Sequence, residues 1–200
     1  MRYGGGSRLT VRMVAGVNES ARPRAVVLSG WLAAVCCVGF AVVNVVFEST
    51  GRFSDGPFAD YAAGLTVMNW LVVLLKLLGA AVAVYSLTTN PKHADALGVL
   101  LWGAFSLLSL YALGSVAEAA AILAGLTGHR DDITLASIAY VAFFTLLAIA
   151  FGVLAFAHSR RFDLTRRPRV LGALGAPLVL AVLLLGVPAL LVALGLMPSL

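Results

Sequence analysis

The chain alternates long apolar runs with short polar connections, and this pattern predicts five membrane-spanning helices. The runs are far longer than a buried strand, and charged residues fall almost wholly between them. Each run can cross a hydrocarbon core of about 30 Å, which takes about 20 helical residues. We therefore expect an all-α polytopic membrane bundle. The predicted spans run from Ala25 to Phe47, Tyr61 to Ser86, Ala96 to Leu126, Ile133 to Ala157 and Val170 to Met197.

The segments that flank these spans are short. Residues 1–24 form a polar lead that contains glycines and five arginines, and residues 198–200 form a tail. A secretory signal peptide has a hydrophobic region of about 7–15 residues, and the first apolar run is longer. We therefore expect the first run to remain as an uncleaved span.

Composition agrees with a membrane protein. Of the 200 residues, 61% are hydrophobic and 12% are charged, whereas a soluble domain has about 45–50% apolar and about 25% charged residues. The formal net charge of +5 could suggest nucleic acid. Basic residues beside apolar spans more often hold topology and contact anionic lipids, so we expect no nucleic-acid partner.

The distribution of Lys and Arg predicts the orientation. If successive connections alternate across the membrane, one side holds eleven of these residues and the other holds two, Arg52 and Arg130. Cytoplasmic loops are enriched in Lys and Arg, so the amino terminus is expected in the cytoplasm and the carboxyl terminus outside, with the plasma membrane as the expected location. The cytoplasmic set is Arg2, Arg8, Arg12, Arg22, Arg24, Lys92, Arg160, Arg161, Arg166, Arg167 and Arg169.

The basic connection before the fifth span has two readings. Its sequence from Ser159 to Leu164 resembles a twin-arginine export signal, but little chain follows the fifth span as a passenger. We therefore favour a cytoplasmic anchor that contacts anionic lipid head groups. The expected lipid-contacting residues are Arg160, Arg161, Arg166, Arg167 and Arg169.

No cofactor or metal is expected. The three histidines, His93, His129 and His158, lie in connections or at span ends, where they would not hold a haem within the membrane. Their spacing and that of the adjacent Cys36 and Cys37 match no zinc or iron motif.

The second span carries a polar stripe. Thr66, Asn69, Val73 and Lys76 are spaced by three or four residues and therefore share one helix face. Lys76 is about 15 Å of helix from Ser86 and farther from the other end of the span. Lys76 is therefore expected inside the hydrocarbon.

The third span carries a second stripe, formed by Tyr111, Ser115 and Glu118. The surroundings of Glu118 depend on the frame of this span, that is, on which of its residues lies at the centre of the bilayer. If the span is centred near Ser109, Glu118 approaches the outer interface; if it is centred near Gly114, Glu118 is buried.

Lys76 and Glu118 are predicted to interact in the second of these frames. Helical side chains lean toward the amino end of their helix, so in an antiparallel hairpin the two groups lean toward each other. Charges in hydrocarbon pair or line water. The pair would either lock the hairpin or serve a proton or ion relay, with Asn44, Glu48 and Asn69 as its outer approach.

Two classes of function follow. The first is a small multi-pass membrane protein with a non-catalytic binding or accessory role, which could include a membrane-protein partner or a second copy of the chain. The second is a small transporter or channel-like protein for protons, ions or a small polar solute that uses Lys76 and Glu118. A lipid-acting enzyme ranks third, because Glu118 and Tyr111 have no nucleophile, metal or cofactor motif beside them in the sequence.

Overall fold

A computed structural model describes residues 23–52, 54, 59–88, 91–129 and 133–195. It contains five long helices, each long and apolar enough to cross a membrane. A backbone in hydrocarbon must satisfy its hydrogen bonds within the segment, and a continuous helix does so. The helices are α1 (Arg24–Ser49), α2 (Ala62–Ser86), α3 (Ala94–Leu123), α4 (Leu135–Arg161) and α5 (Arg166–Ala193).

The predicted all-α membrane fold and its five spans are confirmed, although several helix ends differ. Helix α4 continues to Arg161 and α5 begins at Arg166, so both helices include polar residues that the sequence analysis assigned to the connection between them. Hydropathy reports which residues suit lipid, whereas a helix can continue beyond the hydrocarbon. Most of the predicted lead (residues 1–22), Arg130 and the tail (198–200) lie outside the described residues.

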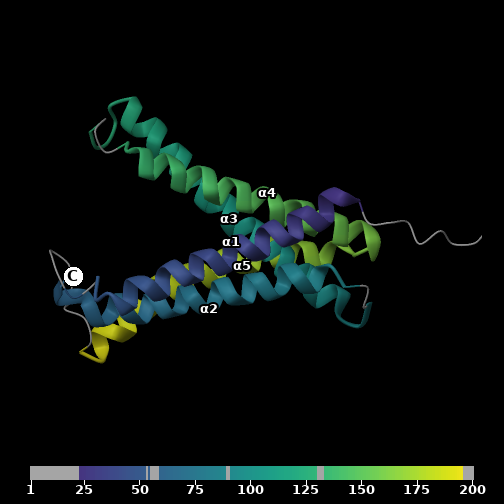
Figure 1. The fold of residues 1–200 in the computed structure, drawn as a ribbon, viewed down its shortest axis with the longest axis horizontal. Coiled ribbons are helices and arrows are strands. Elements are labelled where there is room, and N and C mark those ends of the chain that lie inside the picture. The colour runs from purple at the N-terminus through teal and green to yellow at the C-terminus, as the bar shows by residue number, and fades with distance from the viewer. Residues whose placement is uncertain (1–22, 53, 55–58, 89–90, 130–132, 196–200) are drawn as a thin grey trace, which may run out of the picture.

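The helices alternate in direction, so the connections gather at two ends of the molecule (Figure 1). The start of α1, the α2–α3 connection and the α4–α5 turn lie at one end, which we call the arginine-rich end. Its described basic residues are Arg24, Lys92, Arg160, Arg161, Arg166, Arg167 and Arg169. At the opposite end, α1 and α3 terminate with Gly51 and Gly125 in the left-handed region (φ 64° and 72°), which closes each helix.

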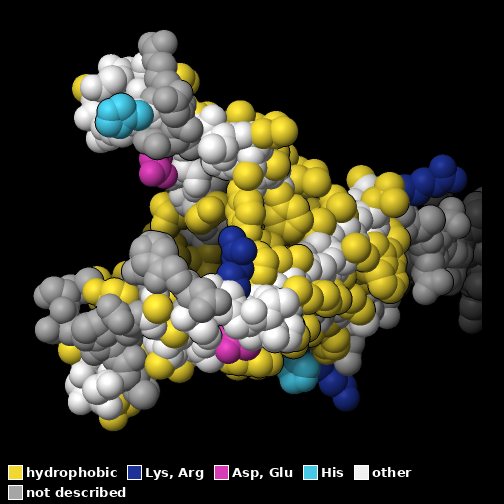
Figure 2. Space-filling view, turned by 60° about the vertical axis from the view of Figure 1, so that its left-hand side comes forward, with side chains coloured by type: hydrophobic (Ala, Val, Ile, Leu, Met, Phe, Trp, Pro, Cys, Tyr) yellow, Lys and Arg dark blue, Asp and Glu magenta, His cyan; other side chains and the backbone are white. Residues whose placement is uncertain are grey.

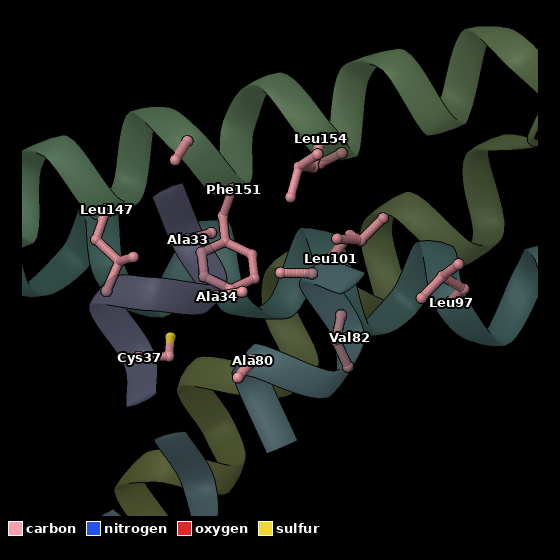
Figure 3. Close-up of a cluster of buried hydrophobic side chains, with 13 residues drawn as sticks. Ala33, Ala34, Cys37, Ala80, Val82, Leu97, Leu101, Leu147, Phe151 and Leu154 are labelled. Carbon is pink, nitrogen blue, oxygen red and sulfur yellow. The ribbon is translucent and has the colours of Figure 1, made fainter. Parts of the chain in front are cut away.

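The core lies in the arginine-rich half (Figure 3). Phe151 and Leu154 of α4 are each 1% exposed and point toward α1 and α3, where Ala33 and Leu101 are fully buried. Small residues such as Ala34 on α1 allow the helices to approach closely. This half is therefore the tightly packed base of the bundle.

Beyond this base the bundle divides into two arms. Helix α1 packs along α2, and α3 packs along α4, while α2 and α3 make few contacts. Figure 1 shows the α3–α4 hairpin turning away from the α1–α2 hairpin toward the end opposite the arginine-rich end. We call these pairs the α1–α2 arm and the α3–α4 arm.

Helix α5 is attached mainly through α3. Ser106 of α3 donates a hydrogen bond to the Ala173 carbonyl of α5 (2.7 Å). Gly103 and Gly172 lie at the crossing, where either Cβ would meet the facing helix. Most large apolar side chains of α5 are exposed and face the surroundings of the bundle. The helix continues through Pro177 and Pro188.

Candidate functional site

A hydrogen-bonded polar cluster joins α1 to α2 inside the α1–α2 arm. Thr66 donates to Glu48 Oε1 (2.9 Å). The Asn69 amide donates to the Asn44 carbonyl (2.9 Å) and approaches Glu48 Oε2 (3.4 Å). The Asn44 amide donates to the Phe40 carbonyl in its own helix (2.8 Å). The structure thus brings Thr66 and Asn69 of the second-span stripe together with Asn44 and Glu48, which the sequence analysis placed in the outer approach.

These contacts satisfy groups that would be costly in lipid. Asn69 is only 7% exposed, and a buried amide without partners would lose its hydrogen bonds to water. Interhelical hydrogen bonds in membranes contribute about 0.6 kcal/mol on average and up to about 1.7 kcal/mol. The cluster therefore stabilises the pairing of α1 with α2, and it occupies both carboxylate oxygens of Glu48.

Lys76 lies where the two arms meet. Its position is two residues from Leu74, the midpoint of α2. The Nζ atom lies 4.8 Å from the ring centre of Phe40, in α1, and 4.6 Å from that of Phe144, in α4. The ammonium group therefore contacts one aromatic ring from each arm.

The aromatic contacts offset only part of the cost of this charge. A Lys at the centre of a bilayer costs about 2.5–3.5 kcal/mol on insertion scales. A cation–π contact contributes about 0.5–1 kcal/mol at exposed sites and about 2 kcal/mol when desolvated. Lys76 is partly exposed, so the described protein does not enclose the side chain fully.

An aromatic cluster surrounds Lys76 and marks the point at which the arms separate. Phe40 stacks on Phe143 (ring centres 5.9 Å apart) and meets Phe144 (5.6 Å) and Tyr140 (6.1 Å) edge-on. Tyr111 of α3 packs on Phe144 (4.4 Å). Bulky side chains hold helices farther apart than the alanines of the base do. The cluster therefore explains locally why α4 diverges from α1.

The predicted ion pair between Lys76 and Glu118 is wrong for this structure: within the described residues, no ion pair joins them. The midpoint of α3 falls at Leu108 and Ser109, which agrees with the frame centred near Ser109 and not with the one centred near Gly114. Glu118 is exposed. Its backbone lies about 17 Å from Lys76 along the bundle by the rise per residue, and α3 leaves the α1–α2 arm in this region (Figure 1).

The α3 stripe contributes one residue to the site. Tyr111 reaches the aromatic cluster, whereas Ser115 is partly exposed and takes no part in the described side-chain contacts around Lys76. The sequence reasoning missed Phe40, Tyr140 and Phe144. Their only signal was an aromatic doublet at 143–144 within an apolar run, which looks like ordinary lipid-facing sequence.

A pocket of about 370 Å³ opens beside the cluster, between α1 and α4. This volume lies within the range of about 300–1,000 Å³ that is usual for small-molecule sites. Figure 2 shows a hollow with mostly hydrophobic walls between the arms. We call the pocket, together with the junction at Phe40 where the arms meet, the inter-arm cleft. The pocket is lined by Cys36, Gly39, Phe40, Val43, Ala139, Tyr140 and Phe143.

The arginines of the α4–α5 turn are presented at the arginine-rich end. Arg160, Arg161, Arg166 and Arg167 are exposed, as lipid contact requires. Arg169 instead donates through Nη2 to the Leu164 carbonyl (2.6 Å). The carboxyl end of α4 is also tied to α3, because Trp102 donates to Ser159 Oγ (2.9 Å).

No protein-family model, curated protein or solved structure matches the chain. The fold therefore defines the class by itself: the protein is a multi-pass helical membrane protein with a divided bundle. Across the described residues, no group of three His, Cys, Asp or Glu side chains is placed to hold a metal ion.

The separation of Lys76 from Glu118 gives a direct prediction. Lys76→Met and Glu118→Gln should change the free energy of unfolding additively, within about 0.5 kcal/mol, because the residues share no contact. Glu48→Gln combined with Thr66→Val provides the positive control, since this pair is joined at 2.9 Å and should show coupling. Chemical unfolding in detergent measures both cycles. A larger coupling for the first pair would show that the two charges meet in the folded protein.

Proposed function

We propose that this protein has a non-catalytic binding role and holds a membrane-soluble ligand in the inter-arm cleft. The observation that carries the proposal is the separation of two helical arms above a tightly packed base, with an apolar pocket at their junction. Apolar walls that are held apart lose the dispersion contacts of a packed interface. A hydrocarbon ligand restores those contacts without requiring the arms to close.

A hydrophobic photoreactive probe tests this proposal. In bilayers, an alkyl diazirine should label the pocket residues of α1 and α4 in preference to the outer surface, as mapped by mass spectrometry of the cleaved protein. Val43→Trp should reduce this labelling several-fold, because Val43 lines the pocket. Val42→Trp is the matched control, since Val42 is the neighbouring residue in α1, is exposed and does not line the pocket. Equal labelling in both variants would refute occupancy of the pocket.

We also propose that the arginine-rich end faces the cytoplasm, in a plasma membrane, and contacts anionic lipids there. The support is the gathering of basic residues at one end of the bundle. Each basic group near an anionic membrane surface contributes about 1 kcal/mol. The amino terminus would then be cytoplasmic and the carboxyl terminus external.

Cysteine labelling tests this orientation. In a background with Cys36 and Cys37 replaced by alanine, Ser54→Cys should react with an impermeant maleimide in intact cells. Thr165→Cys should react only after permeabilisation. Both positions are exposed but lie at opposite ends of the bundle. The reverse pattern would show that the arginine-rich end is external.

A second candidate function is transport of protons, ions or a small polar solute. The observation that favours it is the row of polar groups along one side of α2, from the Glu48 and Asn69 contacts to Lys76. Val73 interrupts this row and is buried, which is why binding ranks first. Flux into liposomes that is lost in Lys76→Met and Glu48→Gln, with folding intact, would move transport ahead of binding.

A further inference from the structure

Lys76 carries a charge that the rest of the described protein does not balance. Its Nζ lies over two aromatic rings, and no carboxylate of the described residues lies within ion-pair distance of it. Glu118 is exposed farther along the α3–α4 arm. The oxygens of Glu48 accept hydrogen bonds from Thr66 and Asn69. A lysine in the middle of a membrane helix ordinarily has a partner or lines water.

Phe40 connects the unbalanced charge with the apolar pocket. Its ring centre lies 4.8 Å from Lys76 Nζ, and the same side chain lines the pocket between α1 and α4, although Lys76 is not one of the lining residues. Phe143, which stacks on Phe40, is part of the same lining. A ligand that extends from the pocket past Phe40 can place one end near the ammonium group while the rest remains among apolar side chains. This arrangement suits a molecule with an anionic end and a hydrocarbon tail.

We propose that the inter-arm cleft binds a single-chain amphiphile that ends in a carboxylate, with the carboxylate against Lys76 Nζ and the chain along the α1–α4 pocket. This inference rests on the proposed binding function and names its ligand class. The ammonium and carboxylate neutralise each other, and the two rings shield the pair from lipid. Charge complementarity thus selects an anionic end, and the pocket lining selects the tail.

The surroundings of Lys76 favour a carboxylate over a phospholipid head group. A phosphodiester head group carries several further polar atoms that need donors when they leave water. The side chains in contact with Nζ are Phe40 and Phe144, which offer none. The polar cluster around Asn69 uses its donors on Glu48 and on the Asn44 carbonyl. A terminal carboxylate requires the fewest additional partners.

Comparison of two ligands of equal length tests the inference. Purified full-length protein in nanodiscs of zwitterionic phosphatidylcholine is titrated with hexadecanoate and with hexadecanol. Hexadecanoate should bind at least about tenfold more tightly, because only it can pair with Lys76. Lys76→Gln should remove this difference and leave hexadecanol binding unchanged, while Lys76→Arg should retain it. Retained hexadecanol binding also reports that the variant is folded.

Arg52→Gln provides the matched control. Arg52 also lies over an aromatic ring, that of Phe47 at 5.2 Å, but at the end of α1; its loss should leave the preference for hexadecanoate intact. Equal binding of acid and alcohol to the unmodified protein would overturn the inference while leaving the proposed binding function standing. Displacement of hexadecanoate by an anionic phospholipid at lower concentration would overturn the carboxylate assignment. Failure of both ligands to bind, with no photolabelling of the pocket, would remove the proposed function as well.

Discussion

Gly172→Ala is expected to lower the free energy of unfolding by about 1–3 kcal/mol, the usual range for overpacking. A Cβ at this position would clash with the Val99 carbonyl, lie 2.7 Å from Trp102 Cβ and lie 3.0 Å from the Gly103 nitrogen. Two of these three atoms belong to the backbone of α3, so no side-chain rotation can relieve the contact. Gly172→Leu should force α5 farther from α3 and loosen the attachment of α5 to the bundle, because α5 is attached mainly through α3.

Gly175 supplies the control within the same helix. A Cβ at Gly175 meets nothing within 4 Å, so Gly175→Ala changes helix propensity and leaves the crossing unaltered. Thermal unfolding in mild detergent should show a lower midpoint for Gly172→Ala and a nearly unchanged one for Gly175→Ala. Equal shifts in the two variants would mean that the effect comes from helix propensity and that the α3–α5 crossing is looser than described.

The five helices could be predicted because lipid imposes a simple requirement on sequence. A span needs a long apolar run and tolerates few charges, and each run here satisfies both conditions. The exact ends were less predictable. Helix α4 includes His158 and Ser159, both buried through contacts with α3: His158 Nε2 lies 2.9 Å from the Ala94 carbonyl, and Ser159 accepts from Trp102. These contacts join residues more than 50 positions apart, which hydropathy cannot register.

The candidate site could be predicted only in part from the sequence. Helical spacing correctly places Thr66, Asn69 and Lys76 on one face of α2. In the structure, Thr66 and Asn69 contact α1, and Lys76 contacts the aromatic cluster. The pairing of Lys76 with Glu118 required an additional assumption, that consecutive spans pack as a close hairpin. Helix α3 instead pairs mainly with α4 and α5. Which helices become neighbours depends on side-chain fit across the bundle, and an apolar sequence carries little information about it.

The division of the bundle depends on where small and bulky residues occur along α1. Ala33, Ala34 and Cys37 fit closely into the base, and the next residues on that face begin with Phe40, which meets three aromatic rings of α4. Close packing at the base therefore supports the open arms above it. Loss of packing at the base should consequently affect both arms together.

Phe151→Ala is the substitution that tests this dependence. Phe151 is 1% exposed and lies at the centre of the base, against α1 and α3 (Figure 3). Phe→Ala in soluble cores costs about 3–5 kcal/mol, which includes transfer of the side chain from water. In a membrane, lipid solvates the side chain of separated helices, so the packing loss dominates and we expect about 2–3 kcal/mol. Ile149→Ala is the control on the same helix, because Ile149 is 58% exposed and should cost much less. The unfolding free energy in detergent measures both substitutions.

If the base holds the arms in place, Phe151→Ala should also lower photolabelling of the pocket, since α1 and α4 would lose their fixed separation. A stability loss in Phe151→Ala no greater than that in Ile149→Ala would show that the base is not the core of the bundle.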